Sequence, residues 1–306
     1  MPARELVDVI VRSAPGSGTA ARATVTDLGG RVGQSIRIIR GFAASVPADV
    51  IEELRSLGAI HSISPDTSIR LFGSSDRQSG GGEFDPKKDA GSLLNTRTSI
   101  GADYLLHRGL TGKGVDIALI DSGVVPVNGL TSAAKVIEGP DLSFESQAES
   151  LRHLDTYGHG THMAGIIAGK DDGAAAGGKK EKAFMGIAPD ARLVSVKVAS
   201  ATGATDVSQV LAAIDWVVQH RRDNGMNVRV LNLSFGTDGT QDYTVDPLTY
   251  AAEVAWRKGI VVVAAGGNAG YGSPQLNNPA YDPYLLAVGA DDANGTLSTA
   301  DDVVPD

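Results

Sequence analysis

Several residue types and patterns are missing from this sequence, and each absence excludes a class of protein. There is no cysteine, which rules out disulfide bonds, thiol catalysis and zinc sites built on thiolates. No run of 18 or more apolar residues occurs, so a membrane-spanning helix is not expected. Lys and Arg number 27 against 36 Asp and Glu, a net charge of −9, and without a basic patch nucleic-acid binding is not expected. The start, MPARELVDVIVR, has no apolar core after its charges and is not predicted to be a signal peptide.

Residues 6–71 predict a small α+β domain of their own. Valines alternate at positions 7, 9 and 11 as in a strand, and a helix is expected over 20–28. Strand material follows over 35–44. Pro47 opens a second helix that Gly58 ends, and a last strand is expected from Ile60 to Ile69. The order β-α-β-β-α-β is that of a ferredoxin-like domain, and His61 is interpreted as structural.

Residues 72–92 predict a flexible, exposed linker. They include the segments SSDRQSGGG and DPKKDAGS, which are polar and hold little that could be buried. Such a segment is a candidate site of proteolytic nicking.

From residue 93 to 306 the chain changes class and predicts a doubly wound, mostly parallel α/β sheet. Apolar runs of strand length alternate with helical patterns. The expected strands are 115–120, 193–198, 228–233, 260–264 and 284–288, and the expected helices include 207–220 and 247–258. Sites in such sheets lie at the carboxyl ends of the strands, which directs attention to Asp121, Ser234 and the run 264–268.

Three side chains are candidates for chemistry. His159, between two glycines in the stretch HLDTYGHGTHMAGIIAG (153–169), is placed as a general base would be, or is a structural histidine at a helix start. Asp121, directly after a strand, can orient a histidine ring or cap the following turn. Asn268, among glycines after another strand, can donate to an oxyanion or occupy a left-handed turn.

The segments IALIDSGV, GHGTHMAG and VVVAAGGNAG, in this order, resemble the subtilisin-like serine proteases. The resemblance implies a serine endopeptidase in which Asp121 orients the base, His159 is the base and Asn268 donates to the oxyanion, with His162 structural. It implies a substrate cleft formed by Ser234, Phe235, Gly236, Ala265, Gly266 and Gly267, and a substrate-pairing edge at Gly203, Ala204 and Thr205. Residues 6–71 then correspond to an inhibitor-like propeptide, the partners are protein or peptide substrates, and the protein is expected to be secreted.

One feature of the family is missing from the printed residues, the Gly-Thr-Ser-x-Ala segment that carries the nucleophile. After Asn268 the only serines are Ser273 and Ser298, and the segment Gly295–Ser298 is only a superficial echo of that motif. The chain as given is therefore expected to be inactive. We interpret it as a fragment of a longer protease; a natural protein that lost its nucleophile and only binds, or a serine supplied by a separate chain, are the alternatives.

Other classes of function fit the sequence less well. His153, Asp155, His159 and His162 could form a metal site, but the HExxH spacing is absent. The segment GAAAGGKK (173–180) nearly matches a phosphate-binding loop but lacks its final Ser or Thr. No cofactor is required by the family chemistry. Calcium is a candidate structural ion, with the acidic pairs 171–172 and 291–292 as candidate sites, although no ligand set can be assigned.

Overall fold

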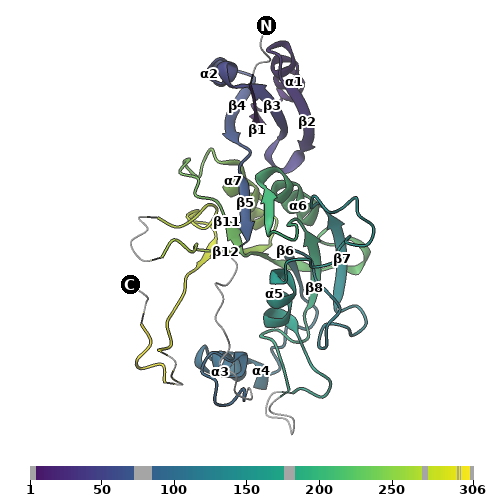
Figure 1. The fold of residues 1–306 in the computed structure, drawn as a ribbon, viewed down its shortest axis with the longest axis vertical. Helices are drawn as coiled ribbons and strands as arrows, with labels where there is room; N and C mark the ends of the chain where they lie inside the picture. The colour runs from purple at the N-terminus through teal and green to yellow at the C-terminus, as the bar shows by residue number, and fades with distance from the viewer. Residues whose placement is uncertain are drawn as a thin grey trace.

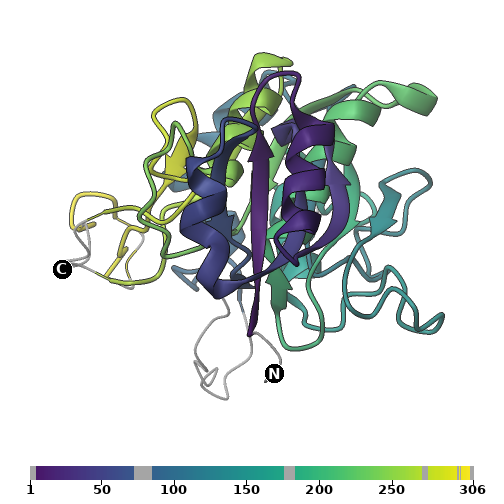
Figure 2. The same cartoon turned by 90° about the horizontal axis from the view of Figure 1, so that it is seen from above.

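The computed structural model describes residues 5–71, 85–175, 183–270, 275–294, 296 and 298–303. Figure 1 shows a small N-terminal domain standing on a larger α/β domain, and Figure 2 shows the small domain from above, with its helices over its sheet. None of the helices in the described ranges is long and apolar enough to cross a membrane.

The small domain is a four-stranded antiparallel sheet with the strand order β2-β3-β1-β4. Its elements are β1 (Leu6–Ser13), α1 (Gly18–Asp27), β2 (Arg31–Ile36), β3 (Gly41–Pro47), α2 (Ile51–Ser56) and β4 (Ile60–Pro65). Two helices bury one sheet face, through Val25 of α1 and Leu54 of α2, both fully buried in one apolar core. The predicted ferredoxin-like α+β domain is confirmed.

Two boundaries in this domain differ from the prediction. The strand material expected over 35–44 is divided by a 3-10 turn, η1 (Arg37–Ile39), followed by Arg40 in the left-handed conformation. The last strand, expected to reach Ile69, ends at Pro65, because proline has no N–H to continue a hydrogen-bond ladder. Residues Ser68–Leu71 form a separate strand, β5, that pairs with the large domain instead.

The large domain is built on a six-stranded sheet with the order β13-β12-β10-β6-β8-β7, and every neighbouring pair is parallel. Its strands are β6 (Asp116–Asp121), β7 (Val136–Asp141), β8 (Arg192–Lys197), β10 (Val228–Leu233), β12 (Val261–Ala265) and β13 (Leu286–Val288). The main helices are α5 (His159–Ala168), α6 (Val207–His220) and α7 (Pro247–Arg257). Two short helices, α3 (Leu93–Ser99) and α4 (Ala102–His107), precede the sheet.

Helices cover both faces of this sheet, as predicted. Along β6, Ile117 and Leu119 lie in the core that includes Ala164 of α5, whereas the alternate residues Ala118 and Ile120 lie in the core with α6 and α7. A strand buried on both sides must be apolar throughout, which is why these strands were recognisable as continuous apolar runs.

Other predicted elements are confirmed with small shifts. Helix α6 has the predicted bounds. Helix α7 begins after Asp246, whose side chain accepts from the backbone N–H groups of Leu248 and Thr249, and Gly259 follows its end at φ +82. The edge strand β7 was missed because its sequence, VIEGPD, has no apolar run.

The predicted linker lies only partly within the described residues. Residues 72–84 are outside them, whereas 85–92 form a hydrogen-bonded turn in which Ser92 caps α3. The domain boundaries drawn at 71 and 93 remain predictions.

Candidate active site

Asp121 ends β6 at the carboxyl edge of the sheet, where it is 1% exposed. A buried carboxylate is costly unless it is hydrogen-bonded. Here Oδ1 accepts from the backbone N–H of Ser122 over 2.7 Å, and both oxygens face Nδ1 of His159. Asp121 is therefore positioned to hold a histidine ring, as the sequence predicted.

His159 is the first residue of α5, after Gly158 in the left-handed conformation at φ +99. Its Nδ1 lies 2.8 and 2.9 Å from the two oxygens of Asp121. Gly160 lets the helix approach this closely, because a Cβ there would collide with the carbonyl oxygen of Gly123. When Nδ1 carries the proton that Asp121 accepts, Nε2 is left free to take a proton.

The charge of Asp121 also affects the basicity of His159. Burial alone would lower the pKa of His159, but the hydrogen bond and the negative charge of Asp121 outweigh it, helped by the charge of Asp155. The net result is a pKa above the ordinary value for histidine. The pair thus favours proton uptake by the imidazole.

Asp155 is a residue whose role the sequence reasoning missed, since it was considered only as a metal ligand. Its carboxylate accepts from Ser122 Oγ at 2.7 Å, from the N–H groups of Tyr157 and Gly158, and from both N–H and Oγ1 of Thr161. These bonds fix the first turn of α5 against the turn that follows Asp121. The usual capping signal does not mark this residue in the sequence, because Asp155 lies three positions before the N-cap of α5, which is Gly158.

A cleft of about 700 Å³ opens beside this pair. His159 and the predicted residues Ser234 and Asn268 line it, together with the backbone of 265–267. Gly267 has φ +118, and a Cβ there would collide with Asn277, so only glycine fits this wall. Phe235 does not line the cleft; it is fully buried in the main core.

The remaining predicted binding residues flank β5. This strand lies between β9 (Ala204–Asp206) and β11 (Phe235–Gly236) in a three-stranded antiparallel sheet, visible at the junction of the domains in Figure 1. Ile69 pairs with Thr205 and Leu71 with Phe235, and both apolar side chains are buried. The N–H of Leu71 donates to the carbonyl of Gly203 over 2.9 Å. The residues predicted to pair with an extended substrate thus pair with the chain's own segment.

The other side chains considered from the sequence have different places. His162 lies exposed on α5 and also lines the cleft, whereas Ser298 is exposed and does not line it, and Ser273 is outside the described residues. The phosphate-loop-like segment is described only as far as residue 175.

No metal site is formed by the cluster at 153–162. Within the described ranges, no group of three or more His, Cys, Asp and Glu side chains could hold a metal ion. Of the acidic pairs, Asp171 accepts from the N–H of Phe184 and Asp292 from the N–H of Asn294. Calcium binding stays a prediction.

Comparison with known proteins agrees with this geometry. A family model described as the subtilase family matches residues 112–303. The serine protease AprX of Bacillus subtilis is 34% identical over 224 residues, which are 71% of this chain and 48% of AprX. The minor extracellular protease Epr of the same organism is 29% identical over 282 residues, 92% of this chain and 39% of Epr.

A solved structure shares the fold. Fervidolysin from Fervidobacterium pennivorans, described as a keratinolytic enzyme related to subtilisin, superposes with a TM-score of 0.64 at 20% identity. The match covers 94% of this chain and 44% of fervidolysin. The chain spans less than half the length of each of these three proteins.

Proposed function

The chain belongs to the subtilase family of serine proteases, and we propose that it is the part of an endopeptidase that supplies the Asp121–His159 pair and an inhibitory propeptide. The observation that carries the proposal is the close approach of His159 Nδ1 to Asp121, 2.8 Å, at the rim of a cleft at the carboxyl edge of the sheet. In this arrangement the histidine accepts the proton of an attacking serine and returns it to the leaving amine.

Each cleft residue has a part in the proposed reaction. Asp121 holds the ring of His159 in the tautomer that leaves Nε2 free, and stabilises the imidazolium that forms. The amide of Asn268 is proposed to donate to the oxyanion of the tetrahedral intermediate. Ser234 and the backbone of 265–267 are proposed to line the pocket for the residue before the scissile bond.

An extended substrate is proposed to occupy the position of β5. A strand added between two exposed edges gains main-chain hydrogen bonds on both sides and places alternate side chains in pockets. Ile69 and Leu71 bury their side chains in the main apolar core, so the position between β9 and β11 suits apolar side chains two residues apart. While residues 5–71 remain docked, β5 excludes other peptides, which is the inhibitory role we propose for them.

Contacts between the two domains support that role. Arg12 of β1 is 5% exposed, donates to the carbonyl of Val245 over 2.9 Å and lies 3.9 Å from the ring centre of Tyr250. Asp66 accepts from the N–H of Ser208 in the first turn of α6, where a helix favours negative charge. Both links lie outside the cleft and hold the domain over it.

The nucleophile is proposed to be supplied by sequence outside the 306 printed residues. The first experiment is to sequence the source gene past the codon for Asp306. A reading frame that continues into a Gly-Thr-Ser-x-Ala segment supports the endopeptidase, and a stop codon favours the alternative of a binding or inhibitory protein without a nucleophile.

Labelling with a fluorophosphonate serine probe tests activity directly. The 306-residue chain is expected to give no labelling and no casein hydrolysis. A longer product carrying the serine segment is expected to label, and its His159→Ala variant to lose labelling, whereas His107→Ala, an exposed change on α4 that does not line the cleft, keeps it. Labelling of the 306-residue chain would overturn the assignment of the nucleophile.

Two lesser proposals follow from the family. The relative Epr is named as extracellular, and we propose the same location for this protein. A structural calcium ion, with its ligands unassigned, is also proposed, and a melting temperature unchanged by a calcium chelator would contradict it.

A further inference from the structure

The connection between β7 and α5, residues 142–158, is long for a loop without helix or strand, and it carries the residues that lead into His159. Loops of this length inside a compact domain need internal anchors to hold one conformation. The anchor here is a buried lysine, Lys197, at the end of β8, whose side chain is completely buried.

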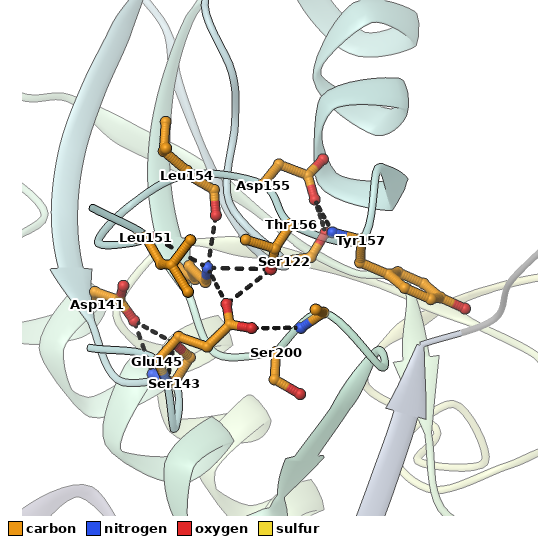
Figure 3. Close-up of polar contacts among 12 residues, drawn as sticks. Ser122, Asp141, Ser143, Glu145, Leu151, Leu154, Asp155, Thr156, Tyr157 and Ser200 are labelled. Carbon is orange, nitrogen blue, oxygen red and sulfur yellow. Dashed lines mark hydrogen bonds and ion pairs between the residues drawn. The ribbon is translucent and has the colours of Figure 1, made fainter. Parts of the chain in front are cut away.

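The ammonium group of Lys197 donates hydrogen bonds to acceptors from several parts of this loop. Its Nζ donates to Glu145 Oε2 at 2.7 Å and to the carbonyl of Leu154 at 2.6 Å, with the carbonyl of Leu151 at 3.4 Å. Figure 3 shows these acceptors converging from different parts of the loop. On β8, Lys197 is the register partner of Asp121 on β6, so the loop is tied to the strand pair that carries the catalytic aspartate.

The two carboxylate oxygens of Glu145 accept hydrogen bonds from two different segments, the end of the loop before α5 and the turn before β9. Oε2 accepts from Thr156 Oγ1 at 2.7 Å as well as from Lys197, and Thr156 directly follows Asp155, which accepts from the N–H of Thr161 in the first turn of α5. Oε1 accepts from the backbone N–H of Ala201 at 2.8 Å, in the turn that leads into the substrate edge β9. Figure 3 shows the Glu145 side chain between Thr156 and the backbone next to Ser200.

This carboxylate is ionised in its bonded position. Burial alone would raise the pKa of Glu145, but bonds from Lys197, Thr156 and the N–H of Ala201 hold the pKa below its ordinary value. Burying an ion pair gains little stability compared with an apolar pair of the same size, whereas removing one partner is strongly destabilising. The use best attested for such pairs is to specify one geometry.

We propose that Glu145, held by Lys197, is a positioning residue that sets the separation between the substrate edge (residues 200–206) and the loop (residues 142–158) that leads into His159. A substrate strand paired with β9 then presents its backbone at a set distance from the imidazole. The consequence for catalysis rests on the proposed peptidase function, whereas the mechanical coupling is a property of this chain and is tested without any activity.

The test is amide hydrogen exchange on the 306-residue chain. In Glu145→Ala, exchange is expected to quicken about tenfold or more at both flanks, since bonds to a charged group are lost. The reporters for the substrate edge are the N–H of Gly203 and that of Leu71 on β5, which donates to the Gly203 carbonyl. The reporters for the histidine side are the N–H groups of Gly158 and Thr161. Amides in the β10–β12 pair serve as the internal reference for global opening.

Thr156→Val removes only the bond from Glu145 to the histidine side and leaves the bond to Ala201 in place, because valine keeps the shape of threonine but lacks its hydroxyl. Faster exchange is expected at Gly158 and Thr161 and not at Gly203 or Leu71. Since this change alters no charge, a lowered titration midpoint of the His159 ring, followed by NMR, reports altered contact with Asp121. The control is Glu52→Ala, which removes an exposed ion pair with Arg55 in the small domain.

Two results would overturn the proposal. One is unchanged exchange at both flanks in Glu145→Ala. The other is an equal increase in all strands, β10 and β12 included, which would make the pair a contributor to global stability alone. If Glu145→Ala does not fold, the proposal is tested on Thr156→Val, by comparing amide exchange at Gly158 and Thr161 with exchange in β10 and β12. These exchange measurements do not depend on peptidase activity. A longer chain that hydrolyses no peptides would therefore contradict the proposed function but not this inference.

Discussion

Leu71 donates its backbone N–H to the carbonyl of Gly203, and this bond ties the last residue of β5 to the turn before β9 in the large domain. Gly203 has φ +71 and lies against the ring of Tyr157, so that a Cβ would approach the ring to 2.8 Å. The turn before β9 is therefore restricted in both conformation and space.

Gly203→Ala is expected to lower the free energy of unfolding. Alanine in the left-handed region costs about 1–2 kcal/mol, and crowding of a packed ring adds about 1–3 kcal/mol. Urea denaturation measures the sum. Gly225→Ala is the matched control, since Gly225 has φ +76 but nothing within 4 Å of its Cβ position. Equal losses in the two variants would show that Tyr157 does not restrict this turn.

Asp121→Asn is expected to lower the titration midpoint of the His159 ring. Asp121 is the main group that raises the pKa of His159 against the effect of burial, and an amide carries no charge to do so. NMR of the ring protons across the titration measures the shift, with the exposed His107 of α4 as a control in the same spectrum. An unchanged midpoint for His159 would mean that the two side chains do not interact in solution.

Asp282 is expected to make the large domain less stable as the pH rises. Burial, with the nearby carboxyl of Glu253, raises the pKa of Asp282 to about 6 from 3.8. A group whose folded pKa is raised contributes its stability when protonated, below pH 3.8, and loses it as the pH rises through about 6.

Asp282→Asn mimics the protonated form and keeps an acceptor for the N–H of Tyr284. The variant should therefore be more stable than the parent at neutral pH and nearly equal to it at low pH. Urea unfolding at a series of pH values measures the difference between the two chains. Asp27→Asn, an exposed change in the small domain, should give no such divergence.

Arg12→Met is expected to weaken docking of the small domain. The change removes the bond to Val245 and the cation over Tyr250, together about 1–3 kcal/mol. The N–H of Ser208, which donates to Asp66 only while the domains are docked, should then exchange faster. Arg22→Met is the control, because Arg22 lies over Phe42 within the small domain itself. Equal exchange at Ser208 in both variants would show that Arg12 is not an anchor of the interface.

Local patterns were enough to predict most of the fold and part of the site. Strands buried on both faces are recognisable as apolar runs. The ends of α7 were predicted from Asp246 and Pro247 at its start and Gly259 after its end. The edge strand β7 escaped prediction because its sequence, VIEGPD, carries no apolar run, whereas β13 at the other edge was predicted from its apolar residues. Asp155 escaped because its partners, from Ser122 to Thr161, gather only when a helix and a strand end meet.

The sequence by itself determined the class of the two domains, the order of their elements and the candidacy of Asp121 and His159, although not the contact between these two side chains. These depend on periodicity, end residues and short motifs, all of which act over neighbouring positions. Only the tertiary structure decided that β5 leaves its own sheet for the gap between β9 and β11, and that Lys197 and Glu145 meet under the loop. Both are contacts between segments far apart in the chain, and their energies depend on burial and distance, which no local pattern records.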